Sequence, residues 1–302
     1  MSDTGKPHTG GASPENADQH APDDPEQGFM RELAQFFVVP SLIVLLCVGV
    51  FLMFGLLSNE QKSARDFLQE VRTRSGGDRW QAAFELSRVL SRQKGTADPQ
   101  LVADVIAVMK TEGGTDPKVR KYLLIALEYL GSREAGPAII ESLEDPDADV
   151  RLHAARALAS LQSVPGAAGP LAKLLADEDA AIRKVAIYAL GQTRDPAAIP
   201  ALLPGLSDPS VEIRWNSALA LAVLGDRTGL PILTQMIDRA HLDSITGITE
   251  DQKTSAVING VQGIYLLRDT ASIPRLKELS EKDPSLQVRE VALKTLEALR
   301  AS

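Results

Sequence analysis

The chain has 302 residues, a formal net charge of −8 and 44% apolar residues, which allows one large folded domain with appended segments. Aromatic residues make up only 4% of it, which favours packed helices over a fold of short strands. The single cysteine, Cys47, excludes an internal disulfide and a cysteine-based zinc site. An acidic chain is poorly suited to binding phosphate backbones, so we expect no nucleic-acid partner.

The first segment, residues 1–32, is predicted to be a disordered acidic tail. It is rich in Gly, Pro, Asp, Ser and Gln, and no large aliphatic residue lies between Met1 and Phe29. Such a composition cannot bury enough apolar surface to offset the entropy lost on ordering.

The next segment, residues 33–59, contains no charged residue, and its core Phe36–Leu57 is apolar apart from Ser41. A helix of that length measures roughly 33 Å, which matches a hydrocarbon layer of about 30 Å. A cleaved signal peptide is the alternative, but its apolar region is shorter, about 7–15 residues, and a small-residue cleavage site follows it. We therefore predict a single transmembrane helix.

Basic residues flank this helix unevenly, which bears on its orientation. Residues 60–77 are expected to form a juxtamembrane helix and linker. Within about 15 residues of the span, the amino side carries only Arg31, whereas the carboxyl side carries Lys62, Arg65, Arg72 and Arg74. Lysine and arginine accumulate on the cytoplasmic side, so the C-terminal part is expected to be cytoplasmic in a single-pass membrane protein. Export of the larger domain is the alternative.

Residues 78–302 repeat one pattern about six and a half times. A turn aspartate precedes Val or Ile and then Arg, with small residues three and six positions after the Arg and leucines further on. The arginine column holds Arg79, Arg120, Arg151, Arg183, Arg214, Val257 and Arg289. Successive positions are 41, 31, 32, 31, 43 and 32 residues apart, so the period is near 31 with two expansions.

A column of prolines lies 17 or 19 residues after the arginine column, at Pro137, Pro170, Pro200, Pro231 and Pro274. Proline is tolerated in the first turn of a helix, so each repeat is predicted to be a helix, a short turn and a second helix opened by proline. Stacked hairpins of this kind form an all-α solenoid. We expect one continuous core along the stack, small residues where neighbouring first helices approach, and second helices on the concave side.

The pattern D-x-x-[VI]-R-x-x-A-x-x-A-L-x-x-L-G resembles the HEAT-like repeats of the bilin-lyase type, over about residues 78–300. This resemblance implies a binding scaffold, although the class also includes chromophore-lyase subunits and an iron-dependent hydroxylase of a modified lysine. That hydroxylase depends on His-Glu pairs for its metal. Here His153 precedes Ala154 and His241 precedes Leu242, so the enzymatic version is not carried over, and we expect no cofactor and no metal.

Two features of the first helices have alternative interpretations. The arginine column is either an electropositive binding ladder or, as we expect, a structural ladder that pairs with aspartates at helix starts. Those aspartates are Asp116, Asp147, Asp179, Asp208 and Asp283. The aromatic residues are interpreted as packing residues, with an aromatic cradle as the alternative. They are Trp80, Tyr122, Tyr129, Tyr188, Trp215 and Tyr265.

Candidate partner-binding residues come from two places. The polar loop at residues 240–251 departs from the repeat, and insertions in solenoids often contact a partner, although a lengthened connector would explain it equally well. Its candidates are His241, Asp243, Glu250 and Asp251. The second helices offer Lys173, Gln235, Arg239, Arg275 and Glu278.

The function that this sequence favours is a membrane-tethered scaffold or adaptor, not an enzyme. Its solenoid would dock another protein, itself membrane-associated, and tethering would raise the local concentration of that partner. The alternative is a lyase-like or assembly-factor subunit that holds a cofactor or chromophore in the concave groove.

Overall fold

The computed structural model describes residues 34–57, 62–74, 77–93, 98–111 and 116–301. The chain forms two compact units, Met1–Gln61 and Lys62–Ser302. The predicted disordered tail, residues 1–32, lies outside the described residues. Throughout the described ranges every regular element is helical, which confirms the all-α prediction.

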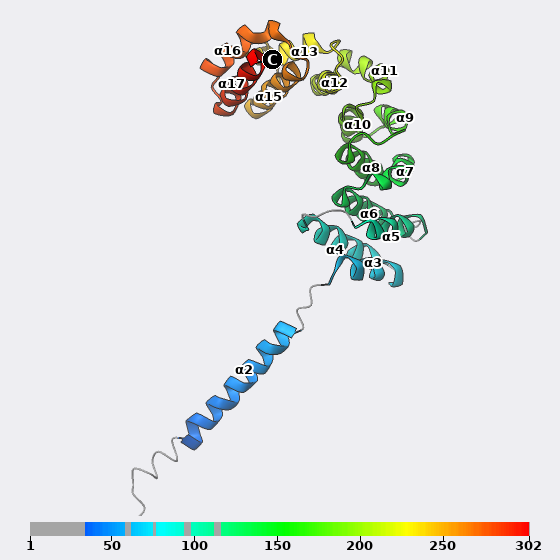
Figure 1. Ribbon diagram of the computed structural model, residues 1–302, viewed down its shortest axis with the longest axis vertical. Coiled ribbons are helices and arrows are strands. Elements are labelled where there is room, and N and C mark those ends of the chain that lie inside the picture. The colour runs from blue at the N-terminus through cyan, green and yellow to red at the C-terminus, as the bar shows by residue number, and fades with distance from the viewer. Residues whose placement is uncertain (1–33, 58–61, 75–76, 94–97, 112–115, 302) are drawn as a thin grey trace, which may run out of the picture. The chain divides into compact units, whose positions relative to one another are not determined.

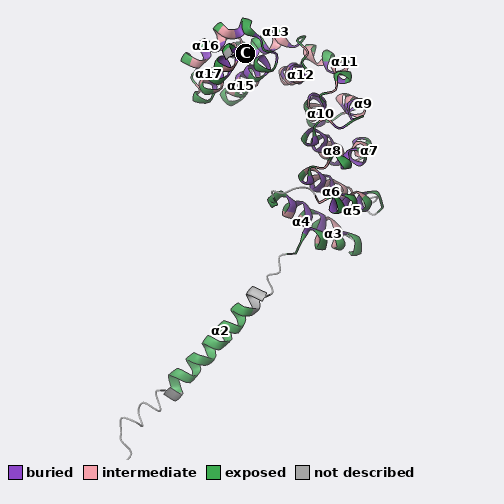
Figure 2. Cartoon of the chain, in the orientation of Figure 1, coloured by how far each residue is buried: buried purple, intermediate pink, exposed green. Residues whose placement is uncertain are grey.

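The described part of the first unit is one apolar helix. A π-helical turn, η1 (Ala34–Val38), leads into α2 (Val39–Leu57). Pro40 has no N–H to donate to the carbonyl of Phe36, which interrupts the regular hydrogen-bond ladder next to that turn. The window Phe36–Met53 has a mean hydropathy of 2.8, and none of its side chains is buried (Figure 2). By length and composition, α2 could cross a membrane.

The second unit is a stack of helical hairpins. Neighbouring first helices pack side by side along the stack. The first helices are α4 (Arg79–Arg92), α6 (Pro117–Leu130), α8 (Ala148–Leu161), α10 (Ala180–Thr193), α12 (Val211–Val223), α15 (Glu250–Leu266) and α17 (Leu286–Ala301). The second helices are α5 (Pro99–Thr111), α7 (Gly136–Glu141), α9 (Ala168–Lys173), α11 (Ile199–Leu202), α13 (Leu230–Met236) and α16 (Ile273–Lys282).

Short 3₁₀ turns extend several of the second helices at either end. They are η2 (Arg133–Ala135), η3 (Ser142–Glu144), η4 (Leu174–Ala176), η5 (Pro196–Ala198), η6 (Leu203–Ser207) and η7 (Thr270–Ser272). Each proline of the predicted column lies in the first turn of α7, α9, α11, α13 or α16. The proline column therefore located the second helices correctly.

Two helices lie outside the regular repeat. Residues 60–77 are expected to form a juxtamembrane helix and linker, and the helix α3 (Ala64–Thr73) lies in this range, where it packs against α4 and buries Leu68 and Val71. It covers the first hairpin as part of the second unit. The other helix is α14 (Arg239–Ser244), which lies in the insertion between α13 and α15.

The second unit curves, and Figure 1 shows which layer is on the inside. From α8 to α17 the first helices lie along the inner side of the curve, while α9, α11, α13 and α16 lie along the outer side. The expectation that second helices line the concave side is therefore wrong. The repeat pattern in the sequence indicates which residues of a hairpin are buried. The direction in which the stack curves depends instead on which of the two helical layers has the smaller distance between neighbouring helices.

The arginine column forms a structural ladder, as predicted, and two of the expected aspartates take part through their carbonyl oxygens, since Arg214 donates to Asp208 and Arg289 donates to Asp283. Other arginines bond to aspartates that were not expected. Arg120 donates to both carboxylate oxygens of Asp145 at 2.7 and 2.9 Å, and Arg151 does the same to Asp177 at 2.7 and 3.2 Å. Arg183 donates instead to the carbonyl oxygens of Asp177 and Glu178 at 2.7 and 2.9 Å. The hydrogen bonds of each guanidinium thus connect its helix to an adjacent turn of the backbone.

The carboxylates of the expected aspartates bond mainly to backbone N–H groups. Asp116, Asp147 and Asp179 accept backbone N–H bonds at the starts of α6, α8 and α10 as N-caps. Asp208 accepts from the backbone N–H of Ser210 at 2.7 Å. In the motif D-x-D the second aspartate caps the helix, which leaves the first one free for the arginine of the preceding repeat.

The small residues three and six positions after the arginine column face different neighbours, and only those at position three depart from the expectation. A Cβ on Gly205 of η6 would lie 2.1 Å from the Oγ of Ser217, and one on Gly260 would lie 2.9 Å from the Cβ of Met236 on α13. Position three after the arginine column therefore accommodates the second-helix layer of the preceding repeat. Position six accommodates a neighbouring first helix, as expected, because a Cβ on Gly191 of α10 would lie 3.0 Å from the Cα of Ala220 on α12.

The fully buried apolar residues form two clusters, and the half-buried Leu206 packs against both. One cluster of buried residues runs from α3 to α12 and includes Ile213 and Leu221, and a second runs from α12 to α17 and includes Trp215 and Ala218. The helix α12 contributes to both clusters. The division falls beside the insertion that contains α14.

Candidate functional site

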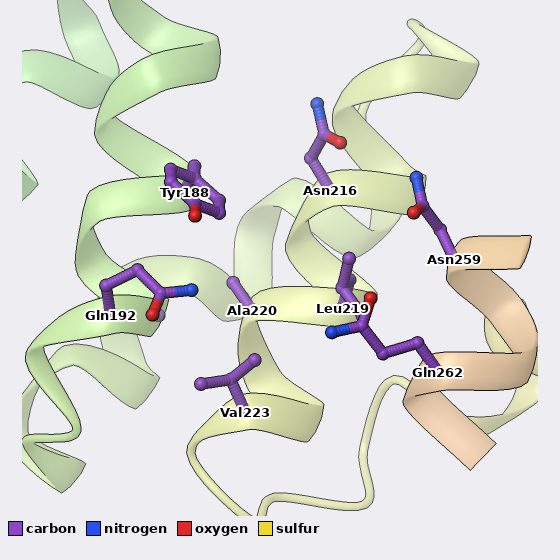
Figure 3. A pocket seen from close by; sticks show the side chains of 9 residues that line it. Tyr188, Gln192, Asn216, Leu219, Ala220, Val223, Asn259 and Gln262 are labelled. Carbon is purple, nitrogen blue, oxygen red and sulfur yellow. The ribbon is translucent and has the colours of Figure 1, made fainter. Parts of the chain in front are cut away.

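The inner face of the second unit is hollowed over three successive first helices. A pocket of 280 Å³ lies there (Figure 3). The helix α10 contributes Tyr188, Gly191 and Gln192 to its lining. The other lining residues are Asn216, Leu219, Ala220 and Val223 on α12 and Asn259 and Gln262 on α15.

The repeat explains why these residues share one face. Asn216 and Asn259 lie two positions after the arginine column, and Tyr188, Leu219 and Gln262 lie five positions after it. Gln192 and Val223 lie nine positions after it. Offsets of three and four residues place side chains on one helix face, so each helix presents the same stripe to the pocket.

The lining is polar but uncharged. It contains four carboxamides, of Gln192, Asn216, Asn259 and Gln262, together with the phenol of Tyr188, which is 57% exposed. Figure 3 shows Tyr188 and Gln192 on one side, and Asn259 and Gln262 on the other. Within the described ranges, none of these carboxamides is engaged by another protein group, so each can donate and accept hydrogen bonds to a ligand.

A second pocket of 270 Å³ adjoins the first, since Asn216 and Asn259 line both. It continues between the starts of α12 and α15, where its charged residues are Glu212 and Asp251. We call the two pockets together the amide groove, defined by its uncharged stretch over α10, α12 and α15 and by an acidic end at Glu212 and Asp251.

The acidic end carries an excess of negative charge. Lys184 forms an ion pair with Glu212, whose other oxygen accepts from Gln252 Nε2 at 3.4 Å. Asp251 is exposed and has no ion-pair partner among the described residues. One lysine therefore faces two carboxylates at this end of the groove.

Only one of the predicted loop residues lines the groove. Asp251 does so, whereas Asp243 and Glu250 each lie 2.7 Å from the Nζ of Lys253. His241 is half-buried on α14. The insertion does not project freely, because Leu242 is fully buried and anchors α14 against the second core cluster.

Four of the residues predicted on second helices lie in that layer, whereas the fifth, Arg239, lies on α14 in the insertion, so a partner at these positions stays a prediction. Lys173 pairs with Glu144 at 2.6 Å, and Arg275 contacts Glu278 at 2.9 Å. Gln235 is exposed on α13. Arg239 donates to both oxygens of Asp283 at 2.8 Å, and this carboxylate raises the pKa of the guanidinium above its usual value.

The aromatic residues of the first helices divide between the two interpretations. Trp215 is buried, and Trp80 stacks on Tyr122 with ring centroids 6.3 Å apart, as packing residues do. In contrast, Tyr129, Tyr188 and Tyr265 are each about half exposed. Only Tyr188 among them lines the groove.

The groove amides were missed because asparagine and glutamine are ordinary residues on exposed helix faces. A partial signal was nevertheless present, since asparagine occupies position two after the arginine column in two neighbouring repeats, at Asn216 and Asn259. The residue types that bind metal ions show no comparable pattern. In the part of the chain that the structure describes, no three His, Cys, Asp or Glu side chains are grouped so that they could hold a metal ion.

The comparisons with known proteins concern the repeat region. A family model described as HEAT repeats matches residues 102–190 and 168–250. The deoxyhypusine hydroxylase of Gallus gallus is 28% identical over 148 residues, which cover 48% of this chain and 46% of that protein. The chain thus spans about half the length of the curated relative that it matches.

Solved structures are similar to this chain over most of its length. The complex of CpcE and CpcF of phycocyanin lyase from Nostoc sp. PCC7120 is similar with a TM-score of 0.52 and 20% identity, over 80% of this chain and 96% of that one. The archaeal HEAT-like repeats protein from Thermococcus onnurineus NA1 gives a TM-score of 0.46 at 14% identity, over 80% and 99% of the two chains. The family match and the hairpin stack together identify this chain as a HEAT-repeat protein.

Proposed function

We propose that the chain is a membrane-tethered scaffold that docks a partner protein on the inner face of its solenoid, at the amide groove. The observation that carries this proposal is the set of four carboxamides on three successive helices whose hydrogen-bonding groups are left open to a ligand. Polar side chains that converge on an otherwise apolar hollow are typical of binding sites.

The proposed tether is α2. Together with η1 it forms a helix from Ala34 to Leu57, and its most apolar window has a mean hydropathy of 2.8 with no buried side chain. An apolar helix that no other part of its own unit covers is stabilised by lipid. Alkaline extraction tests this: the full chain should stay with the membrane, and a Val44→Glu, Leu46→Glu variant should be released.

We propose that the solenoid faces the cytoplasm, because Lys62, Arg65, Arg72 and Arg74 follow the apolar span within about 15 residues while Arg31 alone precedes it within that distance. The test is a Thr246→Cys variant in a Cys47→Ser background, because Thr246 is exposed in the second unit. A membrane-impermeant maleimide should label this cysteine in inverted vesicles and leave it unlabelled in intact cells. The opposite pattern would place the solenoid outside.

Docking on the inner face is tested by photo-crosslinking in native membranes. Benzoylphenylalanine at Tyr188 lies in the groove, whereas the same residue at Leu203 on η6 is exposed in the second-helix layer and serves as the matched control. A discrete crosslinked protein at position 188 and none at 203 is the expected result. The same product at both positions, or none at 188, would contradict docking at the groove.

A cofactor-holding subunit is the second candidate, motivated by the fold shared with the lyase complex. Cofactor pockets generally enclose about 300–1,000 Å³, and the larger groove pocket, at 280 Å³, is smaller than that. An uncharged trough of this size fits a polypeptide segment better. A stoichiometric absorbing group on the purified full chain would reverse this preference.

A further inference from the structure

We propose that the amide groove recognises an extended polypeptide segment that carries a lysine or arginine, with peptide groups against the carboxamides and the cationic side chain at Glu212 and Asp251. This inference rests on the proposed scaffold function and specifies the chemistry of its partner.

The carboxamides point to a peptide backbone. A peptide group offers one N–H donor and one carbonyl acceptor, and a primary amide side chain is complementary to both at once. The uncharged stretch contains no cation that would prefer a phosphate or carboxylate and no anion that would bind a metal ion. A neutral ligand with alternating donors and acceptors matches this stretch best.

The bound segment must be extended. In a helix the backbone donors and acceptors are already paired along its length, so a helical ligand would leave the carboxamides without partners. An extended segment exposes unpaired N–H and C=O groups at every residue and can pair with them. Three helices about 10 Å apart span roughly 20 Å, which corresponds to about six extended residues.

The apolar floor sets the character of the neighbouring side chains. Leu219, Ala220 and Val223 lie on α12 between the carboxamides of the flanking helices, and the half-exposed ring of Tyr188 borders them (Figure 3). Alternate side chains of an extended segment point to the same side. Small or aliphatic residues at alternate positions therefore fit against this floor.

The acidic end supplies the charge preference. Glu212 and Asp251 line the second pocket, and Lys184 neutralises only the first of these carboxylates. A lysine or arginine at one end of the segment would neutralise the remaining carboxylate charge, whereas an aspartate or glutamate there would be repelled by it. Because the acidic end of the groove lies at the starts of α12 and α15, the basic residue of the segment lies there and the opposite end of the segment lies over α10.

The test is a selection of phage-displayed random dodecapeptides against the purified full chain in detergent. We expect enriched sequences with a lysine or arginine at a fixed position, small or aliphatic residues at alternate positions, and no helical periodicity. Synthetic versions of the strongest peptide are then measured by fluorescence anisotropy. Amphipathic helical or acidic consensus sequences, or no enrichment, would overturn the proposal.

Two variants test the assigned contacts. Asn259→Ala should weaken the peptide about fivefold, and N-methylation of one peptide group should do the same, since each removes one hydrogen bond. Asp251→Asn should weaken it about threefold, and should cost nothing further once the peptide's basic residue is replaced by norleucine. Equal affinity of wild type and Asn259→Ala would refute backbone recognition.

Matched controls separate the groove from the rest of the surface. Ser160→Ala changes an exposed residue nine positions after Arg151, equivalent to Gln192 but outside the groove, and Glu297→Gln removes an exposed carboxylate on α17. Both should bind the peptide as wild type does. Crosslinking at position 188 without peptide binding would refute this inference alone, and failure of both would refute the scaffold function as well.

Discussion

Arg239 on α14 donates from Nε and Nη2 to both carboxylate oxygens of Asp283, each at 2.8 Å. The side chain of Asp283 is fully buried, and the repeat that should supply its guanidinium has Val257 in the arginine column. The insertion thus replaces the missing arginine with its own. This explains why α14 is held in the stack although it departs from the repeat.

Replacement of Arg239 by Met should lower the free energy of unfolding by about 3 kcal/mol, because it leaves a buried carboxylate without its charged partner. Thermal and urea unfolding of the full chain in detergent, followed by circular dichroism, would measure the loss. Lys173→Met is the matched control, since its partner Glu144 is exposed, and it should unfold as wild type does. Equal effects of the two substitutions would contradict a structural role specific to Arg239.

The repeat register was predictable because it depends on local rules. In each repeat a proline stands at a helix start and an arginine contacts an adjacent turn, so these residues recur at fixed intervals in the sequence. The helical hairpins could be predicted from these intervals. The pairing of Arg120 with Asp145 rather than Asp147 was harder to foresee. Both carboxylates stand in one turn, and only the backbone path shows that Asp147 caps α8.

The candidate site was much less predictable. The curvature arises because the distance between neighbouring helices differs slightly between the two helical layers. No column of the repeat pattern reveals this difference, so the inner face was assigned to the wrong helices. As a result the candidates fell on the second helices and the insertion, and Asp251 alone reached the groove. Asn216 and Asn259 are recognised as lining residues of one pocket only once the structure shows α12 beside α15 (Figure 3).

Ser217 is a position where a substitution should stabilise the fold. Its Oγ is buried without a hydrogen-bond partner among the described residues, and its neighbours in the same column are Ala154, Ala186 and Ala292. Ser217→Ala should raise the free energy of unfolding by about 1 kcal/mol, because it removes an unsatisfied buried group. Urea unfolding beside the exposed Ser160→Ala would show this, and a lower stability of Ser217→Ala would contradict it.

Arg183 distinguishes a structural ladder from a binding ladder. Its Nη1 donates to two carbonyl oxygens in the turn before α10, so Arg183→Met should lower the free energy of unfolding by about 2 kcal/mol. Binding of the selected peptide at 20 °C should be unchanged, since Arg183 does not line the amide groove. Normal melting together with lost peptide binding would show that the column serves recognition.

His153 should make stability depend on pH in the mildly acidic range. Burial on α8 lowers the pKa of its imidazole, and the nearby cations Arg156 and Lys121 lower it further, while Asp149 acts in the opposite direction. The unfolded chain therefore takes up a proton near pH 6.5 that the native state resists, so stability is complete above about pH 6.5 and falls as the pH decreases. The melting temperature of the wild type should drop more between pH 7.5 and 5.5 than that of His153→Gln. Parallel decreases in both proteins would show that protonation of this histidine does not destabilise the native state.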